Sequence, residues 1–382
     1  MREMKDSGIE WIGEIPKDWK ITRVGNHFYF YSGDSLTSED LNDDGIYPVY
    51  GANGIRGFYN KKNLTGSHII LGRVGALCGN VHLVDSELWV TEHALVSVPF
   101  TEYTINEFYK YMFETMNFRQ YSKASAQPVL SAEVLRQLKM PIPKVGEQKR
   151  IADYLDEKCT KIEAIIEKQQ KIIEKIKEYK LSVITEAVTK GLNPNVEMKD
   201  SGVEWIGEIP AHWSLVKAKY YVDITNGSDP KEEGDIPVYG SGEKSFKTCG
   251  EYKEGPCVLI GRKGATLNIP HYIMGKYWNV DTAFDVKTKK GMLLKYYFYL
   301  ANCFDYNRFI SQTTLPGMTQ TNYNNMLLPV PSIDEQEDIV RYVDEKVKKI
   351  DCVLDNCLKL VDNNANYKRS LIYEVVTGKR EV

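Results

Sequence analysis

Two short glycine turns carry the residues of this sequence best suited to bind a nucleic acid. Gly72-Arg73-Val74-Gly75 and Gly261-Arg262-Lys263-Gly264 each follow an apolar run with the composition of a buried strand. An arginine on such a turn suits bidentate contacts with phosphate or with the O6 and N7 atoms of guanine. The same pattern also occurs in ordinary hairpins, so these turns alone do not decide the function.

A second pair of turns follows a Pro-Val-Tyr-Gly sequence in each half of the chain. Tyr50 and Tyr239 precede these turns, and we expect them to support the turns rather than to stack on bases. Cations on the turns would contact phosphate or guanine, and polar groups would contact base edges. The predicted DNA-binding residues are Asn53, Arg56, Arg73, Ser241, Lys244, Arg262 and Lys263. Gln127 and Thr314, which precede turns at Pro128 and Pro316, are lesser candidates.

Motifs for catalysis and for cofactor binding are missing from the sequence. There is no G-x-x-x-x-G-K-[ST] phosphate loop and no G-x-G-x-x-G after a strand. The Asn-Pro-Pro-Tyr/Phe tetrapeptide of amino-methyltransferases is absent, and Asn193-Pro194-Asn195 is its nearest approach. The histidines have no H-E-x-x-H spacing, so no metal site is expected.

One pattern resembles a nuclease site. Asp235, Glu251 and Lys253 could together bind Mg²⁺ and position a water. The corresponding turn of the first half, residues 57–60, has neither a carboxylate nor a lysine. We therefore interpret these charged residues as solvated surface groups and predict no catalytic residue in this chain.

The chain is a repeat of itself. The stretch Met4 to Trp19 returns as Met198 to Trp213 with three substitutions, 194 positions later. The offset between matching residues is 189 around the glycine turns and 188 from the Pro-x-Pro sequence at residue 141 onward. The sequence therefore predicts one plan of about 190 residues used twice, with a variable globule followed by a closely matched tail.

Each tail is predicted to be a long helix with a heptad repeat. With Ala152 at position a, apolar residues occupy most a and d positions over five heptads, and the pattern recurs 188 residues later. A capping box at Ser332 and Glu335 and the glycines Gly191 and Gly378 mark helix ends. Periodicity alone permits pairing within one chain or between chains, and the duplication favours an intramolecular antiparallel pair.

Composition excludes several classes of protein. The formal net charge of −3 excludes a polycation that binds nucleic acid through bulk charge, and 42% hydrophobic residues exclude a disordered acidic chain. Seven cysteines without a C-x-x-C pair fit a reducing cytoplasm. No signal peptide or membrane span is recognisable, so we expect a cytoplasmic protein.

The sequence resembles the DNA-specificity subunits of type I restriction-modification systems over essentially its whole length. The residues that carry the resemblance are the paired MKDSG-x-EWIGEIP leaders, the Gly-Arg-x-Gly turns, and the Pro-x-Pro sequences followed by Glu147-Gln148 and Glu335-Gln336. The resemblance implies an α+β protein with two α/β target recognition domains in tandem. Each domain is followed by a long helix, and the two helices form an antiparallel coiled coil with pseudo-two-fold symmetry. The implied division is 1–143 for the first recognition domain, 144–191 for the first conserved helix, 192–331 for the second recognition domain and 332–382 for the second conserved helix.

The resemblance also implies a non-catalytic reader of a bipartite, asymmetric DNA site. Two methyltransferase (modification) subunits that carry S-adenosylmethionine would methylate adenine, and restriction-translocation subunits that use ATP and Mg²⁺ would cleave. This chain would hold no cofactor itself, and its helices would set the distance between the half-sites. The alternative is a structural coiled-coil adaptor without its own DNA specificity. Because residues 20–139 carry 11 Lys+Arg against 12 Asp+Glu and residues 214–328 carry 14 against 11, we expect stable DNA binding to need the modification subunits.

Overall fold

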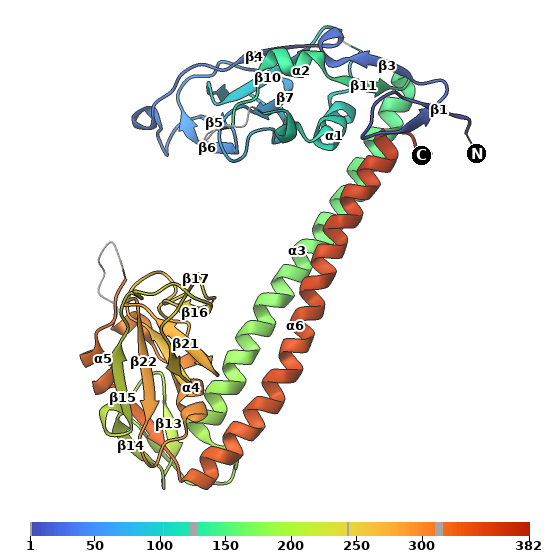
Figure 1. Cartoon of the computed structure of the whole chain (residues 1–382). Helices are drawn as coiled ribbons and strands as arrows, with labels where there is room; N and C mark the ends of the chain where they lie inside the picture. Colours follow the sequence, from blue (N-terminus) through green and yellow to red (C-terminus); the bar gives the residue numbers. More distant parts are fainter. Residues whose placement is uncertain (1, 102, 123–127, 243, 310–315) are drawn as a thin grey trace. The chain divides into compact units, whose positions relative to one another are not determined.

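The chain folds into two compact units (Figure 1). The computed structural model describes residues 2–101, 103–122, 128–242, 244–309 and 316–382. Unit 1 consists of Met1–Gln169 with Leu360–Val382, and unit 2 consists of Gln170–Lys359. Each unit therefore contains one globule together with part of helix α3 (Val145–Lys190) and part of helix α6 (Ile333–Val376). No helix in the described residues is both long enough and apolar enough to cross a membrane.

The globule of unit 1 is built on a four-stranded antiparallel sheet of order β4-β10-β7-β8. Its strands are β4 (Phe28–Ser32), β10 (Ala94–Pro99), β7 (Ser67–Gly72) and β8 (Val81–Asp85). The other strands are β1 (Met4–Asp6), β2 (Glu14–Pro16), β3 (Lys20–Arg23), β5 (Tyr47–Gly51), β6 (Gly54–Tyr59), β9 (Trp89–Val90) and β11 (Lys139–Ile142). They form a β6-β5-β9 sheet and the pairs β1-β2 and β11-β3. The two short helices are α1 (Asn106–Met116) and α2 (Ala132–Gln137).

The globule of unit 2 repeats this plan. Its main sheet, of order β15-β22-β19-β20, consists of β15 (Val222–Asn226), β22 (Ala283–Thr288), β19 (Cys257–Gly261) and β20 (His271–Ile273). A second sheet, of order β17-β16-β21-β18, consists of β17 (Lys247–Cys249), β16 (Ile236–Tyr239), β21 (Lys276–Asn279) and β18 (Lys253–Glu254). The remaining elements are β12 (Met198–Asp200), β13 (Glu208–Pro210), β14 (Ser214–Lys217), β23 (Leu327–Val330), α4 (Leu294–Asn302) and α5 (Gln320–Asn325). Strand pairing is antiparallel except for β5-β9 and β16-β21 among the named strands of the described residues, which identifies the chain as α+β.

The leader of each repeat closes its globule against the long helices. In unit 1, Ile12, Ile15 and Trp19 are buried in one cluster with Ile372 and Val376 near the end of α6. The hydroxyl of Tyr373 also donates hydrogen bonds to the carbonyls of Trp11 and Ile12, at 3.1 and 3.2 Å. The N-terminal leader is thus held by residues more than 350 positions away in the sequence.

The leader of unit 2 uses the matching surface of the other helix. Ile209 and Trp213 share a buried cluster with Ile184 and Val188 of α3. Ile184 and Val188 lie 188 positions before Ile372 and Val376, so the same contact is made twice by different helices. Because these leader residues are buried, each leader closes the core of its own globule.

The Glu-Gln pair at the start of each long helix joins the helix to a leader tryptophan and to the Pro-x-Pro segment that precedes the helix. The indole Nε1 of Trp19 donates to Glu147 at 3.1 Å, and that of Trp213 donates to Glu335 at 3.3 Å. The buried Gln148 donates from Nε2 to the carbonyl of Pro143 at 3.1 Å, and Gln336 does the same to Pro331 at 3.1 Å. The repeated motif is therefore a structural lock at the first turn, where a carboxylate is also favoured by the helix dipole.

The ends of the long helices follow the predicted signals. The hydroxyl of Ser332 accepts a hydrogen bond from the backbone N–H of Glu335 at 3.3 Å, and the Glu335 carboxylate accepts one from the N–H of Ser332 at 3.4 Å. Gly191 and Gly378 lie just beyond the helices with φ of +72° and +73°. This left-handed conformation explains why glycine stands at both positions.

Polar residues that interrupt the heptads meet across the helices inside each unit. In unit 1, Glu163 pairs with Lys368 and the amide of Asn364 donates to Gln169 at 3.1 Å. In unit 2, Lys180 and Asp351 form an ion pair at 2.6 Å. These polar interruptions are therefore matched to partners rather than left buried alone.

Candidate DNA-recognition surface

The three predicted contact residues of unit 1 come together at one end of its sheets. Asn53 is exposed in the turn between β5 and β6, Arg56 is exposed on β6, and Arg73 directly follows β7. A Cβ placed on Gly72 would lie 2.6 Å from the carbonyl oxygen of Ala52, so the hairpin turn packs directly on the Gly-Arg turn. This close approach requires glycine.

The side chain of His82 packs against this hairpin. A Cβ on Gly54 would lie 3.4 Å from the imidazole of His82, and the ring of Tyr50 meets that imidazole edge-on at 6.2 Å. Burial lowers the pKa of His82 below its ordinary value. The imidazole therefore packs against the turn at neutral pH without adding positive charge, and Tyr50 contacts it.

Unit 2 brings Ser241 close to its Gly-Arg turn in the same way. Ser241 and Lys244 follow β16, and a Cβ placed on Gly264 would lie 3.0 Å from the Ser241 hydroxyl. Arg262 and Lys263 border a hollow of about 360 Å³. The hollow is lined by Asn226, Arg262, Lys263, Phe284, Gly317, Met318, Thr319 and Gln320.

Both turn arginines have a structural role that sequence reasoning did not assign. Arg73 donates from Nη1 to the carbonyl of Glu92 at 3.2 Å and to the hydroxyl of Ser32 at 2.8 Å. Arg262 donates from Nη1 to the carbonyl of Asp281 at 3.2 Å. Glu92 and Asp281 are equivalent at the offset of 189, so each arginine anchors the same neighbouring loop. One Nη group of each is thereby occupied, which leaves the rest of the guanidinium for a ligand.

The cations of unit 2 are partly neutralised by one carboxylate. Asp281 lies 4.0 Å from Arg262 and 3.9 Å from Lys263, and all three side chains are at least one-third exposed. Exposed pairs at these distances contribute little stability. Asp281 therefore holds Lys263 only weakly.

A returning segment completes each surface. The N–H of Gly75 donates to Pro128 at 3.0 Å, and that of Gly264 donates to Pro316 at 3.0 Å. Gln127 and Thr314, the lesser candidates, lie outside the described residues. Sequence reasoning missed Asn226, whose exposed side chain lines the hollow at the end of β15; the Asn-Gly pair after an alternating strand was the available signal.

The nuclease-like pattern does not form a site. The amine of Lys253 donates to Asn279 at 2.7 Å and lies 3.3 Å from the buried carboxylate of Asp285. Glu251 accepts hydrogen bonds from the backbone N–H groups of residues 231 and 232. Across the described residues no group of three or more potential ligands could hold a metal ion.

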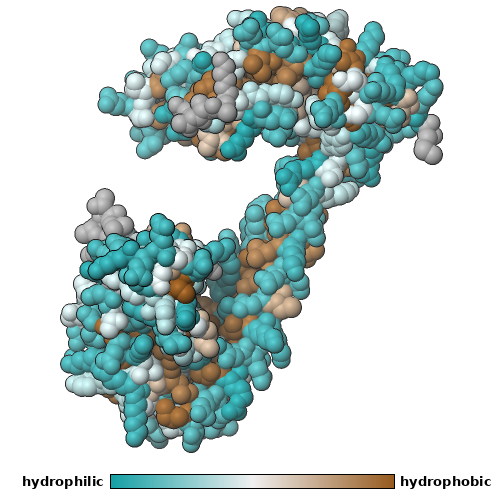
Figure 2. All heavy atoms as spheres, in the orientation of Figure 1, coloured by the Kyte–Doolittle hydropathy of each residue, from teal (hydrophilic) through white to brown (hydrophobic). Residues whose placement is uncertain are grey.

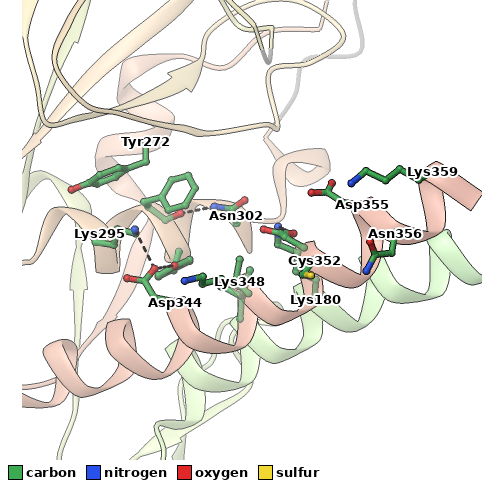
Figure 3. A pocket seen from close by; sticks show the side chains of 15 residues that line it. Lys180, Tyr272, Lys295, Asn302, Asp344, Lys348, Cys352, Asp355, Asn356 and Lys359 are labelled. Carbon is green, nitrogen blue, oxygen red and sulfur yellow. Dashed lines mark hydrogen bonds and ion pairs between the residues drawn. The ribbon is translucent and has the colours of Figure 1, made fainter.

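A larger hollow of unit 2 lies between α4 and the long helices (Figure 3). It measures about 720 Å³ and has lysines and carboxylates on its walls. Lys295 pairs with Asp344 at 3.1 Å, and the Tyr299 hydroxyl donates to the same carboxylate. In unit 1 Tyr111 donates to Asp156 at 2.6 Å, the same contact at the offset of 188. These contacts fasten α1 and α4 to the helices.

Comparison with known proteins identifies the family. The model of the type I restriction modification DNA specificity domain matches residues 16–179 and 218–353. The chain is 36% identical over 156 residues to the type I restriction enzyme EcoprrI specificity subunit of Escherichia coli. This aligned stretch covers 41% of the present chain and 37% of the relative. The present chain is 22% identical over 415 residues to the type I restriction enzyme MjaVIII specificity subunit of Methanocaldococcus jannaschii, covering 96% and 94%.

A solved structure shares the fold. A chain from a study of complex assembly and conformational transition of the type I R-M system aligns with a TM-score of 0.69 at 14% identity, covering 96% of this chain and 99% of that one. The family model covers both repeats and well over half of the residues. The resemblance carried by the leaders, the glycine turns and the Glu-Gln helix starts is therefore confirmed, and the chain belongs to the family of type I restriction-modification DNA specificity proteins.

Proposed function

We propose that this chain is the non-catalytic subunit that reads a bipartite, asymmetric DNA site and directs adenine methylation and restriction by its partners. The observation that carries the proposal is that one frame, used twice, holds two different sets of turn residues. Arg73 and Arg262 occupy equivalent positions, whereas the first hairpin carries Asn53 and Arg56 and the second carries Ser241 and Lys244. A shared frame with different polar groups suits two half-sites of different sequence.

The proposed contacts divide by chemistry. Arg56, Lys244 and Lys263 would contact phosphates or guanine, and Asn53 and Ser241 would contact base edges. Arg73 and Arg262 would add the part of the guanidinium that their anchoring bonds leave unused. Removal of a phosphate contact should weaken binding to all sequences, whereas removal of a base contact should relax one position.

The long helices are proposed to form one antiparallel coiled coil that fixes the distance between the half-sites. The cross-helix partners support this arrangement, because the residue numbers of Glu163 with Lys368 and of Lys180 with Asp351 have the same total, as antiparallel pairing requires. At 1.5 Å per residue each helix is roughly 70 Å long, which exceeds the ~35 Å of one duplex turn.

The repeated surface of the helices supports the proposal of two identical partner subunits. Exposed apolar residues recur at seven-residue spacing on each helix, and Figure 2 shows apolar side chains on the visible face of the helices. The exposed apolar residues are Ile165, Ile172 and Tyr179 on α3 and Val353, Leu360 and Tyr367 on α6. The two sets correspond residue by residue at the offset of 188. Two equal stripes suit two copies of the methyltransferase subunit. S-adenosylmethionine, ATP and Mg²⁺ are assigned to the methyltransferase and restriction-translocation subunits, and a cytoplasmic location goes with this role.

The proposal is tested by mapping methylated adenines in DNA from cells that express the chain with its methyltransferase subunits. We expect one bipartite motif with a fixed spacer. Deletion of four residues from each helix at equivalent positions shortens the helix pair by about 6 Å, which corresponds to a spacer shorter by roughly two base pairs. An unchanged spacer would refute the role of the helices as a ruler.

The alternative, a structural adaptor without DNA specificity, makes the opposite prediction. Methylation would then show no bipartite motif, or a motif unaffected by substitutions in the turns. Nanomolar, sequence-specific binding by the isolated chain would overturn the expectation that the modification subunits supply much of the affinity.

A further inference from the structure

Each recognition hairpin exposes a large apolar side chain on its returning arm, close to the turn. Ile55 lies opposite Tyr50 on β6 and is 55% exposed. Phe246 precedes β17, and its N–H donates to the carbonyl of Val238 at 3.1 Å; its side chain is 60% exposed. Both residues therefore lie on the returning arm of the hairpin, beside the Pro-Val-Tyr-Gly strand, at different positions along it.

Both apolar side chains lie beside the predicted polar contacts. A Cβ on Gly240 would lie 3.7 Å from the ring of Phe246, which places the ring next to the turn that carries Ser241. In unit 1, Ile55 is the direct neighbour of Arg56 and lies two positions after Asn53. The apolar group and the hydrogen-bonding groups thus belong to one hairpin in each unit.

Cations accompany the apolar groups. The amine of Lys247 lies 5.5 Å from the centroid of the Phe246 ring, and Lys244 precedes Phe246 by two residues. The guanidinium of Arg56 donates a long hydrogen bond, at 3.4 Å, to the hydroxyl of Ser38. An exposed apolar side chain flanked by cations is complementary to a DNA groove, where phosphates border base edges that carry apolar methyl groups.

We propose that Ile55 and Phe246 each contact the 5-methyl group of a thymine in the major groove, one in each half-site. This inference rests on the proposed function. Thymine is the base that presents an apolar group in the major groove, and phenylalanine and aliphatic groups are suited to contact it. The isoleucine and the phenylalanine differ in size and reach, so the two thymines occupy different positions relative to the polar contacts of their half-sites.

The test removes the methyl group from the DNA and the side chain from the protein. The wild-type chain in its complex with the methyltransferase subunits is titrated with duplexes that carry the mapped site, with single thymidines replaced by deoxyuridine. We expect one thymine in each half-site at which loss of the methyl weakens binding roughly fourfold, the value for one buried methyl-sized group. Phe246→Ala should abolish this sensitivity in one half-site only, and Ile55→Ala should abolish it in the other.

Met274→Ala is the matched control, because Met274 is 68% exposed in the same unit as Phe246 but lies in the β20–β21 turn, away from the hairpin. It should leave every deoxyuridine effect unchanged. A Phe246→Ala complex that remains fourfold sensitive at the same thymine would overturn the assignment, as would a half-site without thymine on either strand. Failure of the proposed function is distinguishable, because the wild-type complex would then show no bipartite motif at all.

Discussion

Removal of one buried side chain from the end of α6 should release the N-terminal leader, which is remote in sequence. Ile372 is 6% exposed and belongs to the cluster that buries Ile12, Ile15 and Trp19. Its counterpart Ile184, 4% exposed, belongs to the cluster that contains the second leader. Ile372→Ala and Ile184→Ala are thus the same substitution at equivalent positions of two helices.

The expected magnitude follows from the burial. Truncation of a buried isoleucine to alanine costs about 2–5 kcal/mol, including the cavity that remains. A loss of about 3 kcal/mol corresponds to a roughly 150-fold increase in the population of the opened state. The loss should be confined to the unit in which the side chain is buried.

Hydrogen exchange measured by mass spectrometry reports each leader separately. Ile372→Ala should accelerate exchange in residues 4–19 and leave residues 198–213 unchanged, and Ile184→Ala should do the reverse. Leu358→Ala, on α6 but 48% exposed, serves as the control and should change stability by less than about 0.5 kcal/mol. Equal effects of Ile372→Ala on both leaders, or none on residues 4–19, would refute the reasoning.

Three further predictions concern the caps, a half-buried carboxyl group and the ion pair of a buried aspartate. Gly378→Ala and Gly191→Ala should each cost about 1–2 kcal/mol of stability because φ is positive at both positions. Gly378→Ala should lower the thermal midpoint more. Its Cβ would lie 2.4 Å from Pro16, whereas a Cβ on Gly191 would lie 3.1 Å from its nearest neighbour. Burial raises the pKa of Glu114; Lys110 and Lys368 oppose the shift, and Glu163 adds to it. The ionised carboxyl group therefore lowers the stability of the fold as the pH rises above the ordinary pKa of glutamate. Glu114→Gln should stabilise unit 1 in urea unfolding at pH 7 and lose this advantage near pH 4. Lys253→Met should cost about 3–5 kcal/mol because Asp285 would be left buried without its cation, and Lys253→Met combined with Asp285→Asn should recover part of this loss; no loss in Lys253→Met would contradict a structural role.

The candidate surface was predictable in outline but not in detail. Arg73 and Arg262 were recognisable from their glycine turns, yet their bonds to the carbonyls of Glu92 and Asp281 depend on a loop that reaches them only in the folded sheet. Lys253 was interpreted as a solvated surface group because charge and spacing do not reveal burial, but it pairs with the buried Asp285, which is 32 residues away. Hydrogen-bond partners supplied by distant strands leave no periodic signal in the sequence.

The sequence by itself determined the duplication, the two long helices, their caps and the family, because repeats, heptads and capping residues are local patterns that each segment carries alone. Only the tertiary structure decided which helix end covers which leader. It also decided that the glutamates of the Glu-Gln pairs accept hydrogen bonds from Trp19 and Trp213, and that Ile55 and Phe246 remain exposed beside the recognition turns. The physical reason is that burial belongs to the whole fold. Ile184 and Ile372 have the same heptad position, and their roles differ only through the leader that packs on each.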